Sequence, residues 1–384
     1  MKQTTKRICS VTTAAVLLIL LYILEANKYQ NGMLYTLLQK SAILSVVAVS
    51  MNLLNGFTGL FSLGQAGFMS IGAYITALLV IPVEHLDGVY YAGGVSPAIL
   101  AFRTAMAAGP GWLTALYPFL ALILGGLGAA LFAALIGYPV LRLKSDYLAI
   151  ATLGFSEIIR AVVSSPQMDK ITNGSYGLNK IPDFPEMFFG LVPSMITPFL
   201  IAAVCILLMV LLINSSYGRA FKAIREDEVA AEAMGVNLFR HKEMAFVISS
   251  FFTGVGGGLL AMFMRSIEAK TFSIALTYDI LLIIVIGGIG SVTGSILGSF
   301  LVTIGKEGLL RFFDEPLSIG GWEVPLFRPG FRMVIFSILL MVVVLFYRRG
   351  IMGTKEFSWD AVARFPAWVK RKCRGRRPAG GDVK

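Results

Sequence analysis

The sequence predicts an all-α polytopic membrane protein with about ten transmembrane helices, some of them short or broken. Two observations lead to this prediction. Of the 384 residues, 56% are hydrophobic and only 14% are charged, whereas an average soluble chain carries charge on about a quarter of its residues. The charged residues also gather in clusters, and the apolar runs between the clusters reach the length of about 20 residues that crosses a bilayer as a helix.

The candidate spans, in chain order, are 9–25, 34–54, 58–80, 112–137, 147–165, 192–213, 244–265, 277–290, 291–305 and 330–347. The first follows Lys2, Lys6 and Arg7 and resembles a signal peptide, but no clear small-residue cleavage site follows it, so we expect an uncleaved span. The segments 277–290 and 291–305 are each too short to cross alone. They form either one long helix or a hairpin of two short helices.

The distribution of basic residues favours the hairpin and, with it, ten crossings. The basic N-terminus then lies in the cytoplasm together with the stretch 347–384, which holds eleven Lys and Arg against three acids, as the positive-inside rule requires. We therefore divide the chain into a transmembrane domain over 1–346 and a basic cytoplasmic tail over 347–384, with both termini cytoplasmic. A basic tail could bind nucleic acid, but beside membrane spans it more simply marks the cytoplasmic side, so no nucleic-acid partner is expected.

The segment 214–243 follows the sixth predicted span on the cytoplasmic side and is the longest strongly charged stretch between two apolar runs. It has the pattern of one helix, which Ser215 or Ser216 could cap and which Gly235 could end in a left-handed turn. Four apolar residues recur along it at helical spacing: Phe221, Ile224, Ala231 and Met234. Such a helix either joins two spans or docks a soluble partner, and the residues alone leave both alternatives open.

A group of polar residues lies on the second and third predicted spans, where polar side chains are rare enough to be informative. Its members are Asn52, Asn55, Thr58, Ser62, Gln65 and Ser70. They either hydrogen-bond neighbouring helices or line the path of a solute through the membrane.

Two glycine-rich stretches, 55–74 and 287–300, echo each other. In the second, Gly290, Gly294 and Gly298 fall four residues apart, so one helix face is nearly bare and another helix can approach it closely. Helix packing is the simplest role for these glycines, although internal repeats with broken helices also build solute sites near the membrane midplane.

No catalytic, metal or cofactor site is expected from the sequence. It contains no GxSxG or HExxH motif and no Walker phosphate loop. Cys9, Cys205 and Cys373 lie far apart, and His85 and His241 have no partner at ligand spacing. The chain is therefore not expected to be an enzyme or to hydrolyse ATP itself.

Five stretches resemble one known family, the LivM-type permease subunits of bacterial ABC importers for branched-chain amino acids. They are NLLNGFTGLFSLGQAGFMSIGAY at 52–74, SDYLAIATLGFSEIIR at 145–160, TNGSYGLNKIP at 172–182, SYGRAFKAIREDEVAAEAMGVNLFRHKEMAFVIS at 216–249 and IGGIGSVTGSILGSF at 286–300. The resemblance covers most of residues 40–310 and leaves out the basic tail and the 81–111 connection.

The resemblance implies that the loop between the sixth and seventh spans is a cytoplasmic coupling helix, similar to the Glu-Ala-Ala loop of other ABC permeases. The residues expected to couple to an ATPase are Arg225, Glu228, Glu232, Ala233 and Gly235. Met234 lies inside this spacing, and the second alanine of the loop is not in place.

The resemblance also implies partners, namely two ABC ATPase subunits, a second related permease and a periplasmic substrate-binding protein, assembled in the lipid bilayer of the bacterial inner membrane. We expect the chain to give leucine, isoleucine and valine a weakly polar path by alternating access, with no cofactor of its own.

One alternative keeps the importer class and changes the cargo to urea, short amides or other amino acids. Another is an ion-driven secondary transporter, which the lack of an evident buried acid or cation site within the spans disfavours, as the lack of an acid, base or metal cluster disfavours a membrane-embedded enzyme.

Overall fold

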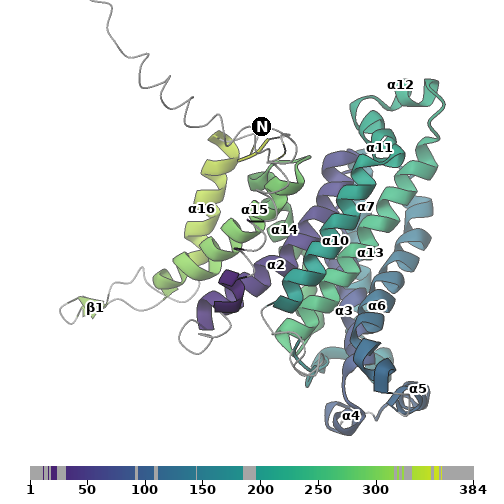
Figure 1. Cartoon of the computed structure of the whole chain (residues 1–384), viewed down its shortest axis with the longest axis vertical. Helices are drawn as coiled ribbons and strands as arrows, with labels where there is room; N and C mark the ends of the chain where they lie inside the picture. Colours follow the sequence, from purple (N-terminus) through teal and green to yellow (C-terminus); the bar gives the residue numbers. More distant parts are fainter. Residues whose placement is uncertain are drawn as a thin grey trace, which may run out of the picture.

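The computed structural model describes residues 32–90, 94–107, 111–143, 145–184, 196–314, 318–319, 322–323, 331–346, 350–353 and 356, with a few residues between 12 and 23. Within these residues the chain is built of helices and their connections (Figure 1), apart from the two-residue strands β1 (Ser318–Ile319) and β2 (Trp322–Glu323), which pair antiparallel. The predicted all-α polytopic membrane fold is confirmed.

Four helical stretches among the described residues are long and apolar enough to cross a bilayer: Gly32–Phe57, Leu116–Val140, Ile196–Asn214 and Leu238–Met264. They belong to α2 (Gly32–Asn52) with the π-helical turn η1 (Leu53–Phe57), to α6 (Gly111–Val140), to α10 (Ile196–Asn214) and to α13 (Leu238–Met264). These helices match the predicted spans 34–54, 112–137, 192–213 and 244–265. The predicted span 9–25 lies largely outside the described residues.

A further apolar helix is bent near its end, as a broken span or a re-entrant loop would be. Helix α7 (Ser145–Val163) is followed by η2 (Pro166–Met168) and α8 (Asp169–Thr172), and the stretch Tyr147–Val163 is bent by 59° against Pro166–Thr172. Pro166 cannot donate a backbone hydrogen bond, which is why the helix does not run on through this point. The chain then enters η3 (Gly174–Tyr176).

The other predicted spans correspond to shorter helices: α3 (Gln65–Val80), α14 (Ile274–Gly287), α15 (Val292–Thr303) and α16 (Phe331–Phe346). The prediction of a span over 58–80 is wrong at its start, since α3 begins only at Gln65. Gly59 has a φ of +77°, a left-handed conformation that ends a helix, and the side chain of Asn55 binds the backbone of Ser62. The stretch 58–64 is therefore an irregular lead into α3.

The segments α14 and α15 form the predicted hairpin and not one long helix. They are separated by the turn Gly288–Ser291, in which Gly288 and Gly290 have φ values of +123° and +86°. The predicted span 291–305 ends too early, because the helical course continues from α15 through the π-helical turn η5 (Ile304–Gly308) and η6 (Leu309–Asp314).

The tightest part of the core is the contact of α3 with α13 and α6. A Cβ on Gly72 would lie 2.1 Å from the carbonyl oxygen of Gly254, and one on Gly257 would lie 2.0 Å from that of Met69. Backbones approach this closely only where side chains are absent, and small residues are the usual device for joining helices in a membrane.

The two ends of the bundle carry different short helices (Figure 1). Helices α11 (Ser216–Glu226) and α12 (Glu228–Ala233) project at one end, between α10 and α13. Helices α4 (Val83–Val89) and α5 (Pro97–Ala107) lie at the other end. The turn that follows α8 joins them there, because the side-chain amide of Asn173 donates to the carbonyl of Val89 at 3.0 Å.

Candidate coupling and translocation site

Between Ser215 and Gly235 the chain forms two helices, α11 and α12, where the sequence predicts one. Ser215 caps α11 and accepts a hydrogen bond from the backbone N–H of Gly218 at 3.4 Å. Asp227 then breaks the helix, with a φ of −159°, and its carboxylate accepts from the N–H groups of Val229 and Ala230 at 2.8 and 3.1 Å. An aspartate caps a new helix better than it continues an old one, which explains the break. Gly235 follows with a φ of +85°, the left-handed turn that the sequence predicts.

The apolar stripe of this segment divides at the break. Phe221, Ile224 and Ala231 are buried as predicted, but Met234 is 85% exposed because the chain has left α12 by that point. Val229 is also 77% exposed. The projecting end of α12 therefore presents two bare apolar side chains, with the exposed Glu232, Ala233 and Gly235 beside Met234.

Arg225, at the end of α11, connects this projecting segment to two other parts of the bundle. Its guanidinium donates to the carbonyl of Gly56 in η1 at 2.7 Å. It also lies against the hairpin turn, since a Cβ on Gly290 would be 2.9 Å from the Arg225 Nη1 atom. Gly59 packs on the stem of the same side chain. A displacement of α11 thus reaches α2 and the α14–α15 hairpin through one residue.

Glu228 makes a different connection. Its carboxylate pairs with the ammonium of Lys242 on α13 at 2.6 Å. This ion pair ties α12 to the first turns of the long helix that follows it.

Asn52, near the same end of α2, binds the hairpin turn directly. Its side-chain amide donates to the Ser291 carbonyl at 2.9 Å and to the Ser295 hydroxyl at 2.7 Å, and its oxygen accepts from the N–H of Gly290 at 2.8 Å. Asn52 is fully buried. The hairpin turn is therefore held between Asn52 on one side and Arg225 on the other.

A cavity of about 650 Å³ lies beside these contacts, between α11, the end of α10 and the hairpin. Its charged lining consists of Lys222, Arg225 and Glu226 from α11 and of Glu356. The Glu356 carboxylate accepts from the Val292 N–H at 2.7 Å. The start of the predicted tail thus packs against the N-terminus of α15, where a negative charge is favoured.

The glycines singled out in the hairpin have two different positions. Gly290 lies in the turn, so the expectation that it shares a helix face with the other two is wrong. Gly294 and Gly298 are on α15 and face α14, since Cβ atoms there would lie 2.5 Å from the Gly287 carbonyl oxygen and 2.4 Å from that of Ile283. These two contacts run in opposite directions along the two helices, which makes the hairpin antiparallel.

The other polar residues of the second and third predicted spans bond within the chain, with one exception. Thr58 donates to the Leu53 carbonyl at 3.0 Å, and the Ser62 hydroxyl accepts from the N–H of Gly64 at 3.4 Å. Gln65 joins α3 to α13, because its oxygen accepts from the hydroxyl of Thr253 at 2.6 Å. The hydroxyl of Ser70 is buried and has no hydrogen-bond partner among the described residues.

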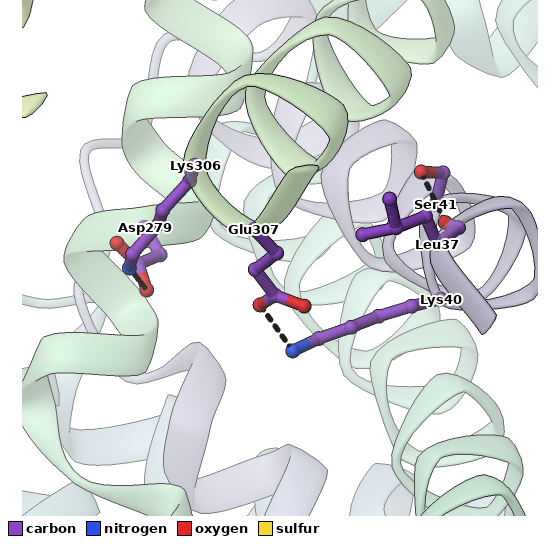
Figure 2. Close-up of polar contacts among 6 residues, drawn as sticks. All are labelled: Leu37, Lys40, Ser41, Asp279, Lys306 and Glu307. Atoms are coloured by element: carbon purple, nitrogen blue, oxygen red, sulfur yellow. Dashed lines mark hydrogen bonds and ion pairs between the residues drawn. The ribbon is translucent and has the colours of Figure 1, made fainter. Parts of the chain in front are cut away.

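Four charged residues that the sequence does not bring together form a row from α14 to α2 (Figure 2). Lys306 in η5 pairs with Asp279 of α14 at 2.6 Å, and the next residue, Glu307, pairs with Lys40 of α2 at 2.5 Å. A signal was present, since Lys40 is the single charged residue of 32–57 and Asp279 the single one of 274–287. Each of the four residues is paired and partly exposed, so none of them is a buried acid or cation site.

The described residues contain no group of three or more His, Cys, Asp or Glu side chains that could hold a metal ion. The ion pair of Glu157 and Arg160 on α7, with an Nη2–Oε2 distance of 2.7 Å, lies apart from the row of four charges.

Comparison with known proteins identifies relatives that match most of the described helices. The family model described as branched-chain amino acid transport system / permease component matches residues 33–345. The high-affinity branched-chain amino acid transport system permease protein LivM of Escherichia coli (strain K12) is 34% identical over 307 residues, which is 73% of this chain and 64% of that protein. The match thus spans somewhat less than two thirds of the length of that relative.

Two more distant relatives are similar over much of their own length. The guanosine ABC transporter permease protein NupQ of Bacillus subtilis (strain 168) is 26% identical over 75% of this chain and 83% of that protein. The high-affinity branched-chain amino acid transport system permease protein LivH of Escherichia coli (strain K12) is 22% identical over 81% and 92%. No solved structure matches the chain. The family match nevertheless covers the spans, the projecting segment and the hairpin alike, and the chain belongs to the family of permease components of branched-chain amino acid transport systems.

Proposed function

We propose that this chain is the membrane subunit of an ATP-driven importer that carries leucine, isoleucine and valine across the bacterial inner membrane by alternating access. The chain has no ATPase site of its own in this proposal. It works with two ABC ATPase subunits, a second related permease and a periplasmic binding protein, needs no cofactor, and has both termini and the tail over 347–384 in the cytoplasm. Family membership and the similarity to LivM support the class and the cargo.

The observation that carries the coupling role is the geometry of α11 and α12. Val229 and Met234 are bare apolar side chains at the projecting end, and exposed apolar groups beside charges suit a protein partner. An ATPase that binds these two side chains would displace α11 when it moves. Arg225 would then transmit the displacement to Gly56 and Gly290, which it contacts. Loop and helix movements of this kind gate many transport cycles.

The path of the cargo is proposed to lie between this chain and its partner permease. Asn52, Asn55, Thr58, Ser62 and Gln65 bond within the chain in this conformation, so they can line the path only if these bonds open during the cycle. Ser70 has no such bond among the described residues, but its side chain is fully buried, so the helices around it would have to separate before it could line the path. At the opposite end, the connections around Asn173 are the proposed dock of the binding protein.

Two substitutions test the coupling role. Glu232→Lys reverses a charge on the exposed surface of α12, and Gly235→Trp puts a large side chain where the φ of +85° strains any residue other than glycine. We expect both variants to insert normally and to leave ATP hydrolysis intact while leucine uptake falls. Gly154→Trp is the matched control, since Gly154 of α7 also has open space around its Cα. Normal uptake in both coupling variants would make α11 and α12 a simple connector.

A second cargo class is favoured by one observation, the similarity to the guanosine permease NupQ. Competition decides between the cargoes. Uptake of labelled leucine by the reconstituted importer should fall with excess isoleucine or valine and stay unchanged with excess guanosine or urea. Uptake of labelled guanosine or urea without leucine would overturn the proposed cargo.

A further inference from the structure

The row of four charges, Asp279, Lys306, Glu307 and Lys40, alternates in sign and has no net charge. Figure 2 shows Lys306 extending toward α14 and Glu307 extending toward Lys40 on α2. The two central residues are adjacent in the π-helical turn η5. A π-helical turn inserts an extra residue into the helical course and is frequent at functional sites. In this chain the π-helical turn η5 carries Lys306 and Glu307, two adjacent charges that face different helices.

The row joins the interior of two apolar helices to the turn η5, which begins directly after α15 ends at Thr303. Lys40 is eight residues beyond Gly32 in the span Gly32–Phe57, which places it about 12 Å along the helix. Asp279 is eight residues before Gly287, at a similar distance of about 12 Å from the hairpin turn. The Arg225 and Asn52 contacts are at the far end of α2 and of the hairpin, so the row is well separated from the coupling segment.

The side chains of the row are only partly covered by the chain. Their exposed fractions are 30% for Lys40, 32% for Glu307, 21% for Lys306 and 37% for Asp279. Ionised groups inside a membrane face the bundle interior or a water-filled cavity, because contact with hydrocarbon is too costly. The uncovered side of the row therefore has to meet water or another polar surface.

We propose that this row lines the water-filled part of the translocation path and binds the charged groups of a zwitterionic cargo. The α-ammonium group would exchange onto Glu307 or Asp279, and the α-carboxylate onto Lys40 or Lys306. The identity of the cargo as an amino acid rests on the function proposed above, whereas the water-filled position of the row does not.

The pairing explains how such a site can release what it binds. In the empty state each charge is satisfied by its neighbour. A zwitterion that inserts between Lys40 and Glu307 breaks one internal ion pair and forms two pairs with its own ammonium and carboxylate. The cost of removing these charged groups from water offsets part of this gain, so the binding stays reversible. Glu307 and Lys306 are on the hairpin and Lys40 is on α2, so a shift of the hairpin against α2 would alter the spacing that the cargo meets.

The position of the row is tested by thiol chemistry in the assembled importer. Cys9, Cys205 and Cys373 are first replaced by serine or alanine, and Glu307→Cys is then compared with Leu301→Cys, a matched control on α15 that is 50% exposed in this chain. A charged, water-soluble thiosulfonate reagent should modify the cysteine at 307 at least about tenfold faster than that at 301, since only a thiol in water ionises readily. Saturating leucine should slow the reaction at 307. Equal rates at the two positions would contradict the proposal and would indicate a face packed on lipid or on the partner subunit.

The role of the charges is tested by neutralising one pair. Lys40→Met with Glu307→Gln keeps the net charge, and we expect the KM of leucine uptake to rise about tenfold while ATP hydrolysis in the presence of loaded binding protein is retained. Arg160→Met with Glu157→Gln is the matched control, because that pair has similar exposed fractions of 36% and 29%. A parallel fall of ATP hydrolysis, uptake and thermal stability in the first variant would show a structural brace and overturn the proposal.

The two experiments separate the two proposals. Wild-type importer that fails to take up leucine contradicts the proposed cargo, and the thiol rates then still report on the row. Wild-type importer that takes up leucine, with a cysteine at 307 no more reactive than that at 301, contradicts the inference about the row alone.

Discussion

Arg225 joins three separate parts of the sequence at one point. Its hydrogen bond to the Gly56 carbonyl spans 169 residues of sequence, and its guanidinium also lies against Gly290. A hydrogen bond that involves a charged donor contributes about 1.5–3 kcal/mol. If this contact exists in only part of the transport cycle, its loss changes the rate of coupled uptake more than it changes the stability of the fold.

We therefore expect Arg225→Ala to lower ATP-dependent leucine uptake by about ten- to hundredfold, the range that corresponds to about 1.5–3 kcal/mol. ATP hydrolysis should remain within about twofold of the wild-type rate, because Arg225 acts in the coupling route and not in the ATPase subunits. Arg219→Ala is the control, because Arg219 is an exposed residue of the same helix. Equal uptake by the two variants would remove Arg225 from the coupling route.

Asn52 is a structural residue in this conformation. Its amide satisfies three partners in the buried hairpin turn, and a buried group left without a partner costs about 1–3 kcal/mol. Asn52→Ala should lower the midpoint of thermal unfolding of the detergent-solubilised chain. Thr104→Ala removes only an exposed hydroxyl bonded within its own helix and should leave the midpoint unchanged. A midpoint that is the same in both variants would mean that water replaces the amide.

At the scale of helices, the α14–α15 hairpin depends on two glycines. A Cβ on Gly298 would lie 2.4 Å from the Ile283 carbonyl oxygen, which belongs to rigid backbone. Gly298→Val should therefore separate the two helices and reduce the amount of folded protein recovered from the membrane. Gly154→Val on α7 meets open space and should be recovered at the wild-type level. Full recovery of the Gly298 variant would show that the hairpin can open without loss.

The long helices could be predicted because length and apolar character are local properties of the sequence. The two-piece form of the projecting segment depends on Asp227, whose carboxylate competes for the N–H groups of the next turn. An aspartate in a helical pattern does not by itself reveal whether the helix continues through it or whether it ends one helix and caps the next. The start of α3 was misplaced for a similar reason, since the glycines of 55–64 fit both a packed helix and an irregular lead.

The row of charges could not be assembled from the sequence. Lys40 and Glu307 are 267 residues apart, and their contact depends on how the hairpin packs against α2. The π-helical turn also matters, because Lys306 and Glu307 face different helices from adjacent positions. Each residue could be noticed as a lone charge in an apolar segment, but not paired.

The two ends of the bundle present different short helices, α11 and α12 at one end and α4 and α5 at the other (Figure 1). The α11–α12 end presents bare apolar side chains and reaches the hairpin through Arg225. The opposite end is closed by backbone and side-chain hydrogen bonds, including that of the Tyr90 hydroxyl to the Ile171 carbonyl at 2.5 Å. Burial raises the pKa of Tyr90 well above its ordinary value, so this hydroxyl stays neutral and keeps donating at physiological pH. We expect the ATPase to bind the α11–α12 end and the binding protein to dock at the opposite end.

In the proposed mechanism this chain moves an amino acid with energy delivered at α12. Accumulation of labelled leucine can be measured in proteoliposomes that hold the chain with its partner permease and ATPase subunits, supplied with loaded binding protein. We expect accumulation that requires ATP, that is lost in Glu232→Lys, and that an imposed proton or sodium gradient cannot replace. Leucine accumulation driven by such a gradient without ATP, or unchanged by the Glu232 substitution, would contradict this mechanism.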